Sequence, residues 1–131
     1  MKLNINNGEI NGYLNTNDPG MVDNASATEI LCPNSNAIHC KNIKQFLDVC
    51  WSKLRLNGKF VLGGLDIVEF AKLVIRYELS AEQKNEIIAN SGNLLSLDEM
   101  VTLCKEAGFT IKKKQLDGMK FLLEMTRENP A

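Results

Sequence analysis

LRLNGKFVLGGLDI (residues 54–67) is the stretch that decides the fold of this chain. Apolar residues at helical spacing lead into it, Asn57-Gly58 is typical of a helix end, and the run at 60–62 predicts a buried strand. A second stretch, SLDEMVTLCKEAGFTIKKKQLDGMKFLLEMTR (96–127), predicts a helix, a Gly-Phe turn and two strands joined by a hairpin turn at Asp117-Gly118. The second half of the chain is therefore expected to alternate helices and strands and to close with an antiparallel hairpin.

The remaining elements follow from the same apolar patterns and turn signals. Two capping boxes, Ser80 with Gln83 and Ser96 with Glu99, mark the starts of helices. We expect helices over residues 42–56, 67–79, 81–89 and 97–106, strands over 2–5, 27–32, 60–62, 109–114 and 121–126, and a short extended piece at 12–15. This order predicts an α/β fold with a parallel core and an antiparallel edge hairpin.

The composition is that of one globular domain. The 131 residues are 44% hydrophobic and carry a net charge of −1, which gives no case for binding to nucleic acid. No apolar run is long enough to span a membrane, and the N-terminus lacks the apolar region of a signal peptide. The cysteines lack the spacing of a metal site, so we expect reduced packing thiols in a cytoplasmic protein and no metal.

The order of the elements resembles the C-terminal half of a class I S-adenosylmethionine-dependent methyltransferase. LRLNGKFVLGGL (54–65) resembles the Leu-Lys-Pro-Gly-Gly segment that opens a strand in that family, and Glu106-Ala107-Gly108-Phe109 resembles the Ala-Gly-Phe turn before its last hairpin. The resemblance implies a partial Rossmann-like methyltransferase sheet of about five strands, flanked by helices, in a single domain over 1–131. It also implies the family's strand order 1-4-5-7-6, in which the last strand of the chain lies inside its neighbour.

LNINNGEINGYLNTND (3–18) is similar to the segment that opens the cofactor-binding half of that family. There a strand leads to a Gly-x-Gly turn whose backbone approaches the cofactor, and an acidic residue holds the ribose hydroxyls. By this resemblance the cofactor-binding candidates are Asn6, Gly8, Asn17 and Asp18, with asparagine replacing the first glycine and the acidic residue. The alternative is a strand and turn that kept their shape and lost their ligand.

Most of the cofactor-binding half is missing from this chain. A strand–helix–strand crossover needs about a dozen or more residues, and fewer lie between Asp18 and the strand at 27–32. We therefore expect no cofactor on the isolated monomer, while S-adenosylmethionine binding stays open if a partner completes the site. Cys32-Pro33-Asn34 is only faintly similar to a methyltransferase motif and His39 has no recognisable partner, so no catalytic residue is assigned.

The lost elements also leave apolar surface without cover. The strands at 27–32 and 60–62 are apolar on both faces and need cover on both, so an open edge and an open face predict self-association as a homodimer. The expected interface is the N-terminal half, Met1–Asn36, or the helical insertion at 67–93. In the last strand, alternation predicts that Phe121, Leu123 and Met125 are buried on one face.

Three functions remain open. The favoured one is a methyltransferase-like domain without independent catalytic activity that acts through oligomer or partner contacts. The second is a minimal S-adenosylmethionine-dependent methyltransferase whose site is completed by dimerisation. The third is a small-molecule binding module that uses the carboxyl ends of the strands.

Overall fold

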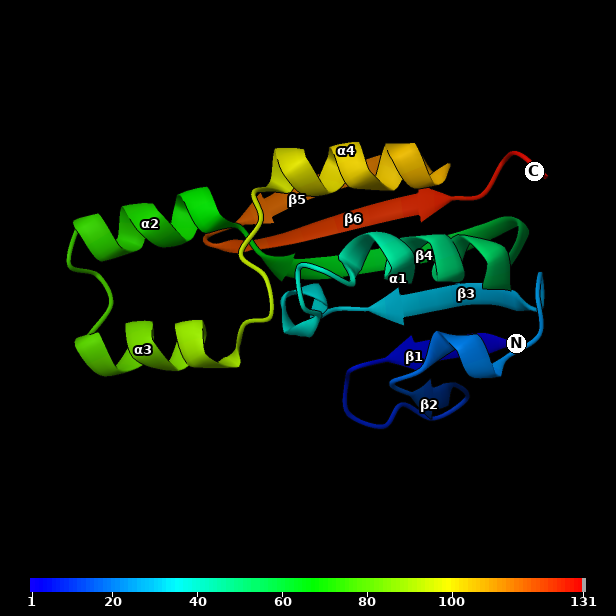
Figure 1. The fold of residues 1–131 in the computed structure, drawn as a ribbon, viewed down its shortest axis with the longest axis horizontal. Helices are drawn as coiled ribbons and strands as arrows, with labels where there is room; N and C mark the ends of the chain where they lie inside the picture. Colours follow the sequence, from blue (N-terminus) through cyan, green and yellow to red (C-terminus); the bar gives the residue numbers. More distant parts are fainter. Residues whose placement is uncertain (131) are drawn as a thin grey trace.

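One mixed sheet and two helices packed on it form the body of the protein (Figure 1). The computed structural model describes residues 1–130. Its strands are β1 (Lys2–Ile5), β2 (Leu14–Thr16), β3 (Ala27–Cys32), β4 (Leu54–Leu65), β5 (Thr110–Asp117) and β6 (Lys120–Thr126). Its helices are α1 (Ile43–Lys53), α2 (Ile67–Ile75), α3 (Ala81–Asn90) and α4 (Leu97–Ala107), with short 3-10 helices η1 (Pro19–Met21) and η2 (Ser35–Ala37).

The strand order β2-β1-β3-β4-β6-β5 confirms the predicted arrangement of five strands and adds β2 at one edge. Strands β2, β1, β3 and β4 are parallel, and β6 runs antiparallel between β4 and β5. The last strand of the chain therefore lies inside its neighbour, as predicted. The fold class, an α/β partial Rossmann-like sheet with a C-terminal antiparallel hairpin, is confirmed.

The end of α1 differs from the prediction. The helix ends at Lys53, and β4 begins at once with Leu54 instead of after Asn57-Gly58. Asn57, with a φ of 63°, takes the left-handed conformation that was expected of Gly58. Gly58 is needed for another reason, since a Cβ there would lie 2.7 Å from the Leu54 side chain and 2.8 Å from the Arg55 carbonyl oxygen.

The hydrophobic core lies between one face of the sheet, here called the front face, and the helices α1 and α4 (Figure 1). From the sheet it receives Phe121, Leu123 and Met125, which confirms their predicted burial. The other fully buried members are Leu3, Ile5, Ala27, Ile30, Cys32, Leu54, Phe60 and Leu62 from the strands, with Leu47, Cys50 and Cys104 from the helices.

The opposite face of the sheet, here called the rear face, carries no helix among the described residues (Figure 1). Because side chains alternate along a strand, the register places Leu31, Val61, Leu65 and Leu122 on this face. The first three are half-buried and Leu122 is 38% exposed. An apolar strip across the central strands therefore faces solvent.

Helices α2 and α3 project beyond the end of β4 instead of folding over the sheet (Figure 1). We call residues 67–91 the arm. Phe70 is the only buried side chain of α2, and α3 buries none. The capping box of Ser80 with Gln83 is present and starts α3. Within residues 1–130, no helix has the length and apolar character that crossing a membrane requires.

Candidate functional site

The crevice between β1 and β3 is the place where this type of sheet binds ligands. The chain leaves β1 toward one edge of the sheet and leaves β3 toward the other, so the carboxyl ends of these strands form the topological switch point. Asn6 follows β1 with a φ of 52°, which confirms that an asparagine can supply the left-handed turn here. The Asn34 side-chain amide donates a hydrogen bond to the Asn6 carbonyl oxygen at 3.2 Å and bridges the two strand ends.

Three of the four predicted cofactor-binding residues lie together. Asn6, Asn17 and Asp18 line one groove of about 290 Å³, and Gly8 does not line it. The opposite wall comes from α1 and the residues near it: Ile38, Asn42, Gln45, Phe46 and Val49. The groove thus combines side-chain amides and one carboxylate with an apolar wall.

One carboxylate oxygen of Asp18 already holds a turn of the backbone. One of its carboxylate oxygens accepts the backbone N–H of Gly20 at 2.9 Å and caps η1. The hydroxyl of Thr16 accepts the backbone N–H of Asp18 at 3.0 Å, which fixes the turn. Asn17 and Asp18 are both exposed, so neither presents a desolvated polar group to a ligand.

Gly8 belongs to a loop that is braced by asparagine side chains. The Asn4 amide donates to the Gly8 carbonyl oxygen at 2.8 Å and to the Asn15 side-chain oxygen at 2.7 Å. Asn15 in turn exchanges hydrogen bonds with both backbone groups of Ile10. No atom would lie within 4 Å of a Cβ on Gly8, so no close approach in this structure requires a glycine there.

The groove lined by three of these candidates is small and only partly walled within the described residues. The switch-point crevice is bridged by Asn34, and Gly8 lies outside the groove. The volume of 290 Å³ is at the lower end of ligand sites, which usually enclose about 300–1,000 Å³. Strand β2 has only three residues and no strand follows it at that edge, so the wall that would hold an adenosine is missing from the described residues.

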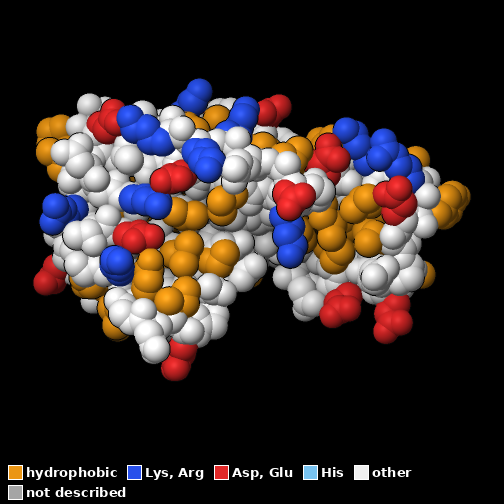
Figure 2. Space-filling model, turned by 180° about the vertical axis from the view of Figure 1, so that it is seen from behind, with side chains coloured by type: hydrophobic (Ala, Val, Ile, Leu, Met, Phe, Trp, Pro, Cys, Tyr) orange, Lys and Arg blue, Asp and Glu red, His pale blue; other side chains and the backbone are white. Residues whose placement is uncertain are grey.

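A larger groove of about 640 Å³ lies where the sheet meets the arm. Gly63, Leu65 and Leu122 contribute from the rear face, and Ile87 contributes from α3. Polar side chains border it as well: Asn34, Asn36, Gln115, Asp117 and Lys120. Figure 2 shows a hollow on this side of the molecule between the body and the arm.

The other candidate residues lie apart from both grooves or pack in the core. Burial raises the pKa of the Cys32 and Cys104 thiols to about 12 and raises that of Cys50 well above its usual value. The ring of His39 accepts the backbone N–H of Lys41 at 3.1 Å, which is a loop contact. Within residues 1–130 no group of His, Cys, Asp and Glu side chains could hold a metal ion.

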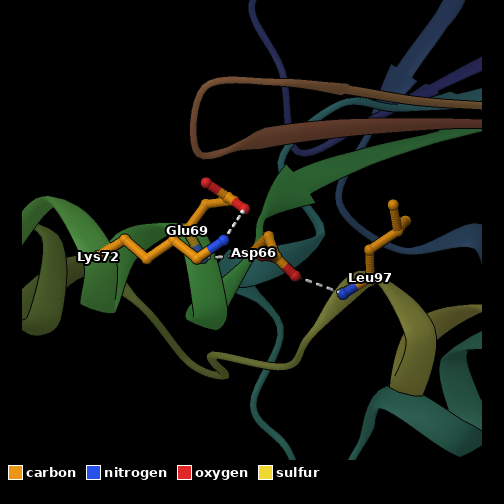
Figure 3. A network of polar contacts seen from close by, with 4 residues as sticks. All are labelled: Asp66, Glu69, Lys72 and Leu97. Carbon is orange, nitrogen blue, oxygen red and sulfur yellow. Dashed lines mark hydrogen bonds and ion pairs between the residues drawn. The ribbon is translucent and has the colours of Figure 1, made fainter.

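Asp66 is a key polar residue that the sequence analysis missed (Figure 3). It is 4% exposed and caps two helices with one carboxylate. One oxygen accepts the N–H of Glu69 in α2 at 2.9 Å, and the other accepts the N–H of Leu97 in α4 at 2.6 Å. An aspartate directly before an apolar helical run is a signal for the first cap. The second cap joins residues 31 apart and has no local signal.

No protein-family model matches the sequence, and no curated protein is similar to it. Solved structures do match. An S-adenosylmethionine-dependent methyltransferase from Thermotoga maritima aligns with a TM-score of 0.65 at 15% identity, covering 88% of this chain and 64% of that one. A methyltransferase bound to its activator protein Trm112, from Haloferax volcanii, aligns at 0.64 and 11% identity, covering 92% and 64%.

A third structure adds a bound ligand. It is the 1,6-didemethyltoxoflavin N1-methyltransferase of Burkholderia thailandensis with S-adenosylhomocysteine, with a TM-score of 0.58 at 13% identity, covering 85% of this chain and 48% of that one. The chain thus spans between about half and two thirds of the length of these structures. At these identities the comparisons show the fold, which is a methyltransferase-like domain over part of the enzymes' length.

Proposed function

We propose that this chain is a methyltransferase-like domain that acts through contact with another chain and lacks independent catalytic activity. The uncovered rear face is the observation that carries the proposal. Interior strands with apolar side chains on both faces need cover on both, and here no described helix lies over Leu31 and Val61, which are half-buried, or over Leu122, which is 38% exposed. A second copy in a homo-oligomer is the simplest source of that cover. We place the protein in the cytoplasm on its cysteine usage.

The candidate cofactor groove supports the absence of independent activity. Independent methyl transfer requires a site that binds the cofactor and places its methyl group against an acceptor. The groove holding Asn6, Asn17 and Asp18 is small and exposed, and the crevice beside it is bridged by Asn34. Gly8, the remaining candidate, faces open space.

The same clustering supports one alternative, a minimal methyltransferase completed by dimerisation. Asn6, Asn17 and Asp18 stand at the switch point where S-adenosylmethionine would bind, and a second chain would have to supply the missing wall. In this reading the four candidate residues hold the cofactor only in the assembly. The third possibility, a small-molecule binding module, rests on the 640 Å³ groove at the carboxyl end of β4.

Isothermal titration of the full chain with S-adenosylmethionine and S-adenosylhomocysteine tests the proposal. Sedimentation of the same sample fixes its oligomeric state during the titration. We expect neither compound to bind with micromolar affinity, whatever the state. Micromolar binding by a monomer would contradict the proposal, and binding only by the dimer would favour the completed enzyme instead.

A further inference from the structure

We infer that two copies of this chain form a two-fold dimer in which the arm of each copy covers the rear face of the other copy's sheet. The inference rests on the proposed function, because it names the chain that supplies the missing cover. The arm and the rear face are two apolar surfaces that no other described element covers.

The arm carries more apolar surface than it buries. Four large apolar side chains on α2, α3 and the turn between them are exposed: Val68 at 49%, Ile75 at 74%, Tyr77 at 92% and Ile88 at 50%. Helices in a soluble protein normally turn such side chains toward a core. This helix pair has only Phe70 buried, so its apolar surface is available to another chain.

The rear face lacks a helical layer of its own. Its apolar strip, formed by Leu31, Val61, Leu65 and Leu122, crosses the three central strands β3, β4 and β6. Charged pairs lie beside the strip, with Lys59 bound to Glu124 at 3.2 Å. A pair of short apolar helices is the element that normally lies on such a sheet.

The arm and the rear face are placed so that two copies of the chain can cover each other symmetrically. Seen from behind, hydrophobic side chains gather on the sheet and again on the arm, with the hollow between them (Figure 2). A two-fold axis through the hollow, parallel to this face, places the arm of one copy on the sheet of the other and repeats the contact.

The size of the contact is that of a stable dimer. The 9 and 10 residues of α2 and α3 span roughly 14–15 Å at 1.5 Å per residue, and two helices side by side are roughly 20 Å wide. Four strands from β3 to β5 span about the same width. Each copy therefore contributes two footprints of roughly 300 Å² each, or roughly 600 Å² in all, which is the lower end of the roughly 600–1,000 Å² per partner of specific interfaces.

Charge favours contact between arm and sheet over contact between two arms. Helix α3 carries Glu82 and Glu86 against a single Lys84. The rear face of the hairpin carries Lys113, Lys120, Asp117 and Glu124, and Glu124 is bound to Lys59 of β4 at 3.2 Å. The charges left without an ion pair among the described residues are Lys113 and Lys120 against Asp117 on the sheet, and Glu82 and Glu86 against Lys84 on α3. An arm on the sheet therefore brings unpaired charges of opposite net sign together, whereas two facing α3 helices bring like charges together.

The test uses the full chain and three glutamate variants in sedimentation equilibrium. Leu122→Glu alters the rear face and Ile75→Glu alters the arm, where Ile75 is 74% exposed, so each should weaken dimerisation about tenfold or more. Leu116→Glu is the matched control, because Leu116 lies on the neighbouring strand, faces the opposite side of the sheet and is 46% exposed. It should dimerise like the wild type, and circular dichroism shows whether each variant is folded.

Mixing the two damaged variants gives the decisive result. In a reciprocal dimer of Leu122→Glu with Ile75→Glu, one arm–sheet contact carries both substitutions and the other carries none. The mixture should therefore form a heterodimer more tightly than either variant forms a homodimer. A monomeric wild type, or a mixture no tighter than the variants alone, would overturn the inference. Neither result tests whether the protein binds the cofactor. Micromolar S-adenosylmethionine binding by a monomer would contradict the proposed function and would leave the inferred dimer untested by that measurement.

Discussion

Replacing Asp66 with alanine should destabilise the protein far more than a typical loss of a helix cap. The carboxylate caps α2 through Glu69 and α4 through Leu97, and it is almost fully buried. Losing a cap usually costs about 0.5–2 kcal/mol, and a buried donor left without a partner costs about 1–3 kcal/mol. The N–H of Leu97 is the buried one of the two. We expect a loss of about 2–4 kcal/mol in the free energy of unfolding, a large share of the roughly 5–15 kcal/mol that a domain usually has.

Urea unfolding followed by the fluorescence of Trp51, the only tryptophan, measures this loss. Asp66→Asn keeps one acceptor oxygen and should fall between the wild type and alanine. Ser80→Ala is the control, because it removes an exposed cap from a helix that buries nothing, and it should cost about 1 kcal/mol or less. If Asp66→Ala costs no more than Ser80→Ala, the shared cap does not hold the arm and α4 to the sheet.

The remaining predictions concern a close approach in the core and the cysteines. Gly108→Ala should cost about 1–3 kcal/mol in urea unfolding, because Gly108 has a φ of 108° and a Cβ would lie 2.9 Å from the Trp51 ring nitrogen. With a thiol reagent at neutral pH, only the exposed Cys40 should react in the native protein, and rapid labelling of a second thiol would count against the buried core. Burial raises the pKa of Cys32 and Cys104 to about 12, so their thiols stay neutral in the folded chain while they ionise in the unfolded one. The free energy of unfolding therefore keeps its full value below about pH 8.5, the usual thiol pKa. It should fall by up to roughly 1.4 kcal/mol per pH unit for each thiol as the pH rises toward 12. In urea unfolding, the free energy of unfolding of the Cys32→Ala variant should depend less on pH than that of the wild type. An unchanged pH dependence would refute the link between thiol burial and stability.

The closing hairpin could be predicted because its signals are local, whereas the order of the strands came from the family resemblance. The Gly108-Phe109 turn and the hairpin turn after Asp117 each lie within a few residues of the elements that they join. The end of α1 was misplaced because distant residues decide it. Leu54 pairs with Ala27 in the sheet, and the guanidinium of Arg127 donates to the Leu54 carbonyl oxygen at 2.8 Å.

The candidate site shows the same division between local and distant causes. The left-handed turn at Asn6 is a local feature, because asparagine tolerates a positive φ more readily than most residues. The bridge from Asn34 to Asn6 and the second cap of Asp66 join residues 28 and 31 positions apart, and neither leaves a local trace in the sequence. The expected need for glycine at position 8 came from the family resemblance. In the structure the Asn4 side chain holds the Gly8 loop by a hydrogen bond, and Gly8 does not line the groove.

Titration calorimetry of S-adenosylhomocysteine into a proven monomer tests the central claim most directly. Leu122→Glu supplies that monomer if the inferred dimer is correct, and dilution of the wild type supplies it otherwise. Because the described residues lack a wall for the adenosine and the switch-point crevice is bridged, the account predicts no measurable heat of binding at micromolar concentrations. A saturable signal with micromolar affinity from a folded monomer would contradict it.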